Sequence, residues 1–276
     1  MLRRGGWGVA ALVLGACAAG QPVEVSREPS DMGAMSEQEF RALHRPRSEA
    51  AGPHQGEELV VGGARAYLRL PEGAPGPTPA VLVLHDVGGL SEHFLLWSDR
   101  LAAEGYAALA VDLYGTQEAT APDGTVTAVK TLDAARAWKV LQAAHAFLVK
   151  DERVRAPRTA VIGWGLGGSW ALRLGMGEPT LDAVVSYSGL VEADPEALSH
   201  LRAPLLVLLG TKDATLPAEQ QEAFVQALDE AQGLHRVLRY EAEHGFENPA
   251  SGQYDARVAA AAWQAVDLFL ERQLKR

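Results

Sequence analysis

The sequence predicts an α/β fold with a mostly parallel central sheet and helices on both of its faces. Short runs of Val, Leu and Ala recur along the chain, and nearly continuous apolar runs are typical of strands that are buried on both faces. Stretches of helical periodicity separate these runs, which is the pattern of strand–helix units in a parallel sheet. The 276-residue chain is 47% hydrophobic and 22% charged, as expected for a globular protein.

The first two strands flank Gly62-Gly63, where a tight hairpin turn is expected. Five later strands are short, mainly apolar runs: 80–85, 106–113, 159–164, 181–187 and 204–210. A further strand is expected at 235–241, which is more polar. The helices share an apolar period of 3.6 residues: 94–105, 131–149, the segment after Gly167, 218–231 and 254–274. No apolar run in this region is long enough to span a bilayer.

The first residues, MLRRGGWGVAALVLGAC, have the layout of a secretory signal. Arg3 and Arg4 form a basic start, and the apolar run at 7–16 is too short to span a bilayer as a helix. The run ends in Leu-Gly-Ala-Cys, which resembles a bacterial lipobox, whose cysteine receives a diacylglycerol. Cys17 is therefore the expected lipidation site, and an ordinary signal peptide that contains a cysteine is the alternative.

The chain divides into three predicted segments. Residues 1–16 form the lipoprotein signal peptide, 17–56 a lipid-anchored flexible tether, and 57–276 one folded domain. The tether is rich in Pro, Gly, Ser and Glu and lacks strand periodicity. The lipobox resemblance, with Ala18 after the cysteine, implies a protein of the bacterial cell envelope. It would be anchored in the outer membrane and face the periplasm or the cell surface.

Charge and composition narrow the expected partners. The formal net charge is −10, and a chain this acidic lacks the basic footprint that nucleic-acid binding needs. Membrane contact is expected only through Cys17, and that single cysteine leaves no internal disulfide. His85 and His93 lie near Asp86, but their spacing fits no standard metal site, so neither metal nor cofactor is expected. The oligomeric state is not predicted.

The stretch VIGWGLGG, residues 161–168, reads as a buried strand that runs into a glycine-rich turn and then a helix. It resembles the nucleophile elbow of α/β-hydrolases, Gly-x-Ser-x-Gly, with Gly163 and Gly167 as the outer glycines. Gly165 occupies the nucleophile position and has no side chain that could attack a substrate. The sequence therefore raises the question whether covalent catalysis survives at this site.

Two further residues follow strand ends in the order of the α/β-hydrolase triad, first Asp213 and then His244. Ligands bind beyond the carboxyl ends of the strands in open α/β sheets, so these loops are expected to meet. A histidine takes and returns a proton near neutral pH, and a carboxylate orients its ring. The backbone N–H groups of Val87 and Leu166 are expected to form an oxyanion hole.

Residues 57–276 resemble the dienelactone hydrolase family of α/β-hydrolases, in the stretches LHDVGGL, LAAEGYAALAVDLYG, GWGLGG, GTKDATLP and EHGFENP. The resemblance implies an α/β-hydrolase fold and an esterase or lactonase ancestry with a Cys-His-Asp triad. Carried over to this chain, it makes Asp213 the acid, His244 the base and Gly165 the vacant position of the nucleophile.

Two other positions bear on the activity that the resemblance implies. Asp86 falls where the family has a glutamate that helps activate the cysteine, and a simple loop-capping role is the alternative. Asn248 stands four residues after His244, where the founding activity uses an arginine to hold a small carboxylate substrate. Dienelactone is therefore not the expected substrate.

The sequence is compatible with three functions. The first is binding of a small ester, lactone or acyl ligand, or of a partner protein, without efficient turnover. The second is an active carboxylic-ester or lactone hydrolase that combines His244 and Asp213 with Ser188, Ser91 or an activated water. This second function predicts a hydroxyl or a water within about 3 Å of a His244 ring nitrogen. The third is a surface scaffold whose pocket is filled by side chains.

Overall fold

The computed structural model describes residues 54–73, 76–120 and 126–275. The predicted signal peptide, Cys17 and nearly all of the predicted tether lie outside these residues. Within the described part of the chain, no helix is both long and apolar enough to cross a membrane.

Eight strands form one sheet in the order β1-β2-β4-β3-β7-β8-β9-β10. The strand β2 pairs antiparallel with β1 and with β4, and every other neighbouring pair is parallel. This mostly parallel sheet confirms the predicted fold class. The strands are β1 Glu57–Val61, β2 Ala64–Arg69, β3 Ala80–Leu84, β4 Ala107–Val111, β7 Thr159–Trp164, β8 Ala183–Tyr187, β9 Leu205–Gly210 and β10 His235–Tyr240.

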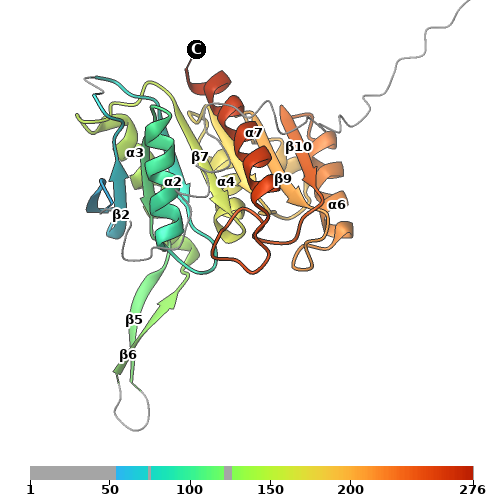
Figure 1. The fold of residues 1–276 in the computed structure, drawn as a ribbon, viewed down its shortest axis with the longest axis horizontal. Helices are drawn as coiled ribbons and strands as arrows, with labels where there is room; N and C mark the ends of the chain where they lie inside the picture. Colours follow the sequence, from blue (N-terminus) through green and yellow to red (C-terminus); the bar gives the residue numbers. More distant parts are fainter. Residues whose placement is uncertain (1–53, 74–75, 121–125, 276) are drawn as a thin grey trace, which may run out of the picture. The chain divides into compact units, whose positions relative to one another are not determined.

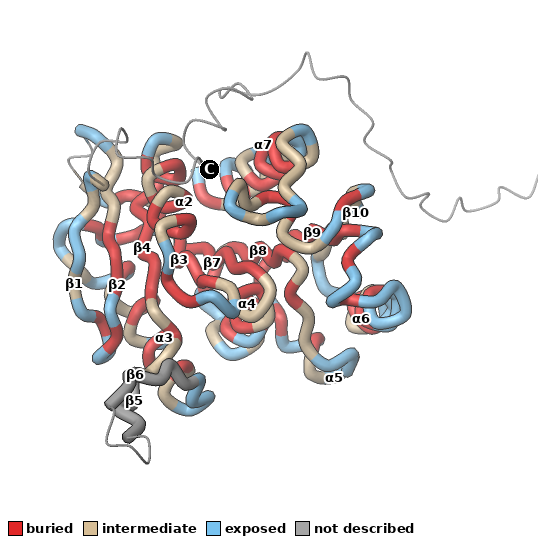
Figure 2. The backbone as a smooth tube through the Cα atoms, turned by 60° about the horizontal axis from the view of Figure 1, so that its bottom comes forward, coloured by how far each residue is buried: buried red, intermediate tan, exposed pale blue. Residues whose placement is uncertain are grey.

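Helices cover both faces of the sheet (Figure 1). Successive strand residues point to opposite faces, so Leu82 and Leu84 pack with α3, α4 and α6, whereas Val81 and Val83 pack with α2 and α7. Figure 2 shows the buried residues running through the central strands. The helices are α2 Glu92–Ala103, α3 Ala134–Lys150, α4 Leu166–Gly177, α5 Pro195–Leu198, α6 Ala218–Glu230 and α7 Ala256–Leu274.

Two aspartates set helix starts that periodicity alone placed two or three residues too early. The side chain of Asp133 accepts hydrogen bonds from the N–H groups of residues 135 and 136, so α3 begins at Ala134. Asp255 does the same for residues 257 and 258, and α7 begins at Ala256. Side-chain capping, and not the apolar pattern, thus sets the first residue of each of these helices.

The structure also contains elements that the sequence analysis did not predict. The strands β5 (Gly115–Thr120) and β6 (Val126–Thr131) pair with each other in a separate antiparallel sheet, and α5 is a single helical turn. The segments GTQEAT and VTAVKT lack the long apolar run by which the other strands were recognised. The prediction that residue 131 lies in a helix was wrong, because it is the last residue of β6.

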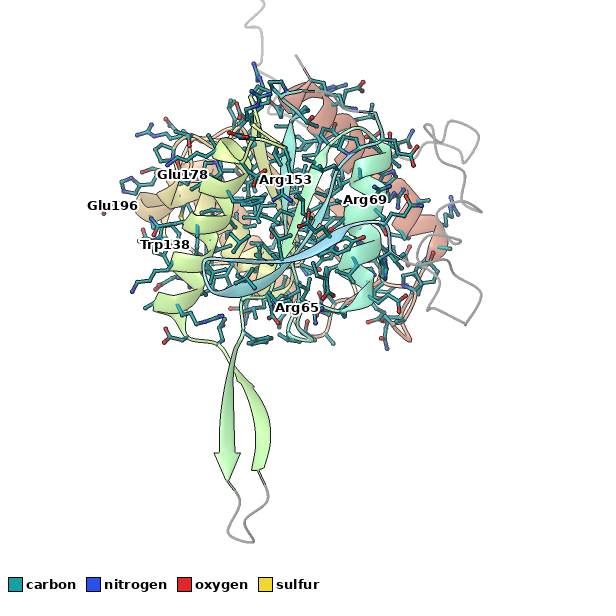
Figure 3. The ribbon with its side chains drawn as sticks, turned by 90° about the vertical axis from the view of Figure 1, so that its left-hand side faces the viewer. Arg65, Arg69, Trp138, Arg153, Glu178 and Glu196 are labelled. Atoms are coloured by element: carbon teal, nitrogen blue, oxygen red, sulfur yellow. The ribbon has the colours of Figure 1, made fainter. Side chains whose placement is uncertain are left out.

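Charged side chains connect the β1–β2 edge of the sheet to neighbouring parts of the fold, and Figure 3 labels two of them, Arg69 and Arg153. Arg153 pairs with Glu57 of β1 at 2.6 Å, and Arg69 of β2 lies 3.4 Å from Asp99 of α2. The hydroxyl of Tyr67 donates a 2.7 Å hydrogen bond to the same Asp99. The Arg153 pair is exposed and contributes little stability, whereas the Asp99 contacts tie the edge to a helix.

Candidate functional site

A cavity of about 350 Å³ opens beyond the carboxyl ends of β3, β7, β8, β9 and β10. This is the place where open α/β sheets bind their ligands. Loops that follow five different strands supply its walls. The lining includes Asp86, Gly165, Ser188, Thr215, His244 and Glu247.

His244 and Asp213 meet at this cavity. The Nδ1 atom of His244 lies 2.7 Å from Oδ2 of Asp213, whose side chain is fully buried, whereas the His244 side chain is 42% exposed. This geometry assigns the ring proton to Nδ1, which donates it to the carboxylate. The other ring nitrogen, Nε2, is then the one available to accept a proton.

The Asp213 carboxylate is held by a tight turn. Its Oδ1 atom accepts hydrogen bonds from the N–H and the hydroxyl of Thr215 at 2.9 and 2.6 Å, and from the N–H of Leu216 at 3.1 Å. Burial alone would raise the pKa of Asp213, but the hydrogen bonds from Thr215 and His244 outweigh it and lower that pKa. Asp213 is therefore ionised at neutral pH and orients the imidazole.

Gly165 sits at the turn between β7 and α4, with φ +48° and ψ −109°. Its N–H donates to the carbonyl of Tyr187 at 2.8 Å, which anchors the turn to β8. A Cβ atom at residue 165 would lie 4.0 Å from both Cε1 and Nε2 of the His244 ring. One more bond from that Cβ brings an oxygen or sulfur within hydrogen-bond reach of Nε2. Residues 165, 213 and 244 thus stand in the geometry of a nucleophile, an acid and a base.

The loop after β3 carries Asp86 and Val87. Asp86 lines the cavity and also caps its own loop, because its Oδ1 accepts a 2.7 Å hydrogen bond from the N–H of Gly88. The side chain of Val87 is exposed, and its carbonyl accepts from the hydroxyl of Tyr114 at 3.0 Å. Leu166 is the first residue of α4. The oxyanion hole formed by the N–H groups of Val87 and Leu166 stays a prediction.

His85 and His93 are held by hydrogen bonds of the core. Nδ1 of His85 lies 2.7 Å from the Asp86 carbonyl, and its Nε2 accepts from the N–H of Leu113 at 2.9 Å. Nε2 of His93 accepts from the indole of Trp97 at 3.1 Å, and burial lowers the pKa of His93 to about 3. Among the described residues, no group of three or more His, Cys, Asp or Glu side chains is arranged to hold a metal ion.

Of the two serines considered as nucleophiles, one lies at the cavity and the other does not. Ser188 lines the cavity directly after β8, with φ +47°, a region that residues with side chains rarely adopt. Its register places it beside Gly165, since Trp164 pairs with Tyr187. Ser91, in contrast, is the residue that precedes α2 and is not part of the cavity lining. Neither hydroxyl forms a hydrogen bond with His244 in the described structure.

The hydroxyl that does lie near the His244 ring belongs to Thr215, which the sequence analysis missed. Its Oγ1 atom is 2.9 Å from Nδ1, on the same side as Asp213. Because this hydroxyl already donates to Asp213, it orients the ring and is poorly placed to attack a ligand near Nε2. The only sequence signal was its position two residues after the aspartate in GTKDATLP.

Glu247 is a second site residue that the sequence analysis missed. It lines the cavity and is buried. Burial raises the pKa of Glu247 to about 7, and the nearby Asp86 and Asp213 act in the same direction, although His244 opposes them. Its position three residues after His244 was the only hint in the sequence. A carboxyl group whose pKa burial raises toward neutrality, inside a cavity, is a candidate functional group.

Glu247→Gln should stabilise the protein at pH 8 and have little effect at pH 4. The folded pKa of Glu247, about 7, lies above the ordinary value of 4.5, so its stabilising protonated form is lost as the pH rises through this window. Removing the charge should raise the free energy of unfolding at pH 8 by roughly 1–3 kcal/mol. Urea unfolding at both pH values measures this, with exposed Glu58→Gln as the matched control. An effect of Glu247→Gln that does not vary with pH would contradict the expectation.

Comparisons with known proteins show which family this chain resembles. The model of the dienelactone hydrolase family matches residues 64–274. A relative from Synechocystis sp., provisionally named a carboxymethylenebutenolidase, is 30% identical over 227 residues, covering 76% of this chain and 92% of the relative.

Two solved structures extend the comparison. A dienelactone hydrolase-like promiscuous phosphotriesterase from metagenomic libraries superposes with a TM-score of 0.65 at 26% identity, covering 79% of this chain and 97% of the other. Native esterase 2 of Thermogutta terrifontis shares the fold, with a TM-score of 0.61 at 19% identity, covering 84% of this chain and 96% of the other. The chain belongs to the dienelactone hydrolase family.

Proposed function

We propose that this protein binds a small ester, lactone or acyl ligand in the cavity beside His244 without efficient turnover. One observation carries the proposal: residue 165 is a glycine, although its Cβ position lies 4.0 Å from Nε2 of His244. The acid and the base are in place, and the group that they would activate is missing. The 350 Å³ cavity favours a ligand-binding role over a scaffold whose pocket is filled by side chains.

The remaining machinery supports only slow chemistry. A triad that lacks one member retains about 10³–10⁴-fold acceleration over water, from the oxyanion hole and binding. Enzymes usually reach at least about 10⁶-fold. His244, oriented by Asp213, has a free Nε2 that can hydrogen-bond to a ligand oxygen or to a water. The site can therefore hold an acyl group, but residue 165 supplies no atom to receive it.

A rate comparison tests the proposal. The wild-type chain and His244→Ala are assayed side by side on short chromogenic esters. We expect the two rates to be the same within error, because a site without a nucleophile gains little from its base. Turnover by the wild type that is lost in His244→Ala would overturn the proposal and indicate an active hydrolase.

The second candidate function is an active ester or lactone hydrolase with Ser188 as the nucleophile. The observation in its favour is the φ of +47° at Ser188 beside Gly165, since backbone strain is common at functional sites. In this function, the Ser188 oxygen would bond to the acyl carbon while His244 takes the hydroxyl proton and returns it to the leaving alcohol. Water, activated by His244, would then release the acid and restore the Ser188 hydroxyl. Ser188→Ala would then abolish any turnover that depends on His244, and unchanged turnover would exclude Ser188.

We further propose that the domain at 57–276 is held at the bacterial cell envelope by a lipid on Cys17, through a tether at 17–56. The support is the sequence of residues 1–17 alone. Two or more acyl chains give stable membrane anchoring, whereas a single chain is marginal. Fractionation of cells that express wild type and Cys17→Ser tests this. Wild type should sediment with the outer membrane, and equal release of both forms into the soluble fraction would contradict the anchor.

A further inference from the structure

We infer that the cavity selects a cationic ligand, a small ester or acyl compound that carries an ammonium group, and rejects ligands that carry a carboxylate. This inference rests on the proposed function, since it names the ligand class of the same cavity. Three features of the described lining carry it: its charge, its neutral polar groups and two buried polar atoms without partners.

The charge of the lining is acidic. Asp86, Glu243 and Glu247 all contribute to the cavity wall. Asp213 lies directly behind His244 and adds a further carboxylate, whose pKa is lowered, so that it is ionised at neutral pH. Among the described residues, neither Lys nor Arg belongs to the lining. The one lining residue that can become positive is His244.

The rest of the polar lining is neutral. Asn248, Ser251 and Gln253 offer amide and hydroxyl groups, which bind an ester oxygen or an N–H but cannot neutralise a carboxylate. Arg100 interacts electrostatically with Tyr187 but is not part of the lining. Its guanidinium lies 3.7 Å from the ring centre of Trp263. A ligand carboxylate would therefore meet several like charges in the cavity and no cationic side chain apart from a protonated His244.

Two lining side chains point independently to a polar ligand. The indole Nε1 of Trp164 and the hydroxyl of Tyr187 are buried and have no hydrogen-bond partner among the described residues. Both residues line the cavity, and their rings stack 5.3 Å apart at 12°. Buried polar groups are almost always satisfied, so an orphaned pair at a cavity wall indicates a partner that comes from a ligand or a water.

Three esters of similar size, one cationic, one neutral and one anionic, test the inference. The probes are acetylcholine, its neutral isostere 3,3-dimethylbutyl acetate, and the anionic ester 4-acetoxybutanoate. Binding to the purified full chain is measured by titration calorimetry at pH 8. We expect acetylcholine to bind at least about tenfold more tightly than the neutral isostere, because the carboxylates of the lining attract the ammonium group and have no such attraction for the uncharged isostere. The anionic ester should bind more weakly than the neutral one.

Matched variants identify the charge responsible. Glu247→Gln should reduce the preference for acetylcholine over its isostere severalfold, and Glu243→Gln, at the exposed mouth, provides a second removal of charge. Glu58→Gln removes the same charge from β1, at the opposite edge of the sheet, and should leave the preference unchanged.

Each outcome decides the inference. A preference for the cation that falls in Glu247→Gln or Glu243→Gln but not in Glu58→Gln supports it. Equal binding of all three probes, tighter binding of the anionic ester, or no saturable binding of acetylcholine would overturn it. None of these results depends on turnover, so the proposed lack of catalysis is judged separately by the comparison of wild type with His244→Ala.

Discussion

Gly165→Cys should hydrolyse a short chromogenic ester at least about 100-fold faster than the wild-type chain. The Cβ position at residue 165 is 4.0 Å from Nε2 of His244, and no described atom outside residues 164–166 comes closer. A thiol on that Cβ can therefore give its proton to His244. The thiolate then bonds to the acyl carbon, and His244 returns the proton to the departing alcohol. Water, activated by the same ring, releases the acid from the thioester.

Two matched variants make the Gly165→Cys result interpretable. Gly165→Ala carries the same backbone strain, about 1–3 kcal/mol at φ +48°, but no nucleophile, and it should remain inactive. Adding His244→Ala to Gly165→Cys should remove the gained activity. A Gly165→Cys protein that folds, as judged by circular dichroism, and yet hydrolyses no faster than Gly165→Ala would contradict the arrangement described here.

Gly167→Ala should destabilise the protein by more than about 3 kcal/mol, the second large effect that we expect. A Cβ on Gly167 would lie 2.3 Å from the carbonyl oxygen of Leu84 and 2.4 Å from that of His85. Both oxygens belong to the backbone at the end of β3, so they cannot move away without displacing a central strand. The helix α4 packs against the sheet at this point only because residue 167 has no side chain.

Urea unfolding of Gly167→Ala and Gly165→Ala measures the contrast. Both substitutions add one methyl group near the start of α4. The methyl at residue 165, however, would be 4.0 Å from the nearest described atoms outside residues 164–166, which belong to His244. The loss of stability should therefore be much larger for Gly167→Ala. Equal losses in the two variants would mean that the close approach of α4 and β3 does not require glycine.

Much of this fold could be predicted because its strands are buried on both faces. Such strands appear in the sequence as short apolar runs, and the run at 159–164 coincides with β7. The spatial meeting of Asp213 and His244 could also be anticipated, since each follows a strand of one parallel sheet and the carboxyl ends of such strands share an edge. Periodicity and chain order were sufficient for these features.

Other features depend on tertiary contacts that no local pattern contains. The raised pKa of Glu247 follows from burial, which depends on how the loop after β10 folds over the cavity. The contact of Thr215 with the His244 ring depends on the turn that Asp213 closes through its own hydrogen bonds. The strands β5 and β6 of the hairpin are largely polar, so the sequence contains no apolar run that would predict them. The missed features are therefore those set by loops.

The destabilising ionisation of Glu247 agrees with the inferred ligand class. Glu247 is buried, and the ionised form of a buried carboxyl costs folding free energy. In Glu247, that cost would be offset when an ammonium ion enters the cavity. The Glu247→Gln variant is thus expected to gain stability and to lose ligand preference.

Labelling with a fluorophosphonate, followed by intact-mass measurement and peptide mapping, tests most directly whether the cavity holds a protein nucleophile. We predict that the wild-type chain stays unlabelled, whereas Gly165→Ser acquires one adduct at residue 165, because that hydroxyl would face Nε2 of His244. A wild-type adduct on Ser188 or Ser91 that disappears in His244→Ala would contradict our account. Such an adduct would identify an active hydrolase whose nucleophile has moved from the elbow to a neighbouring loop.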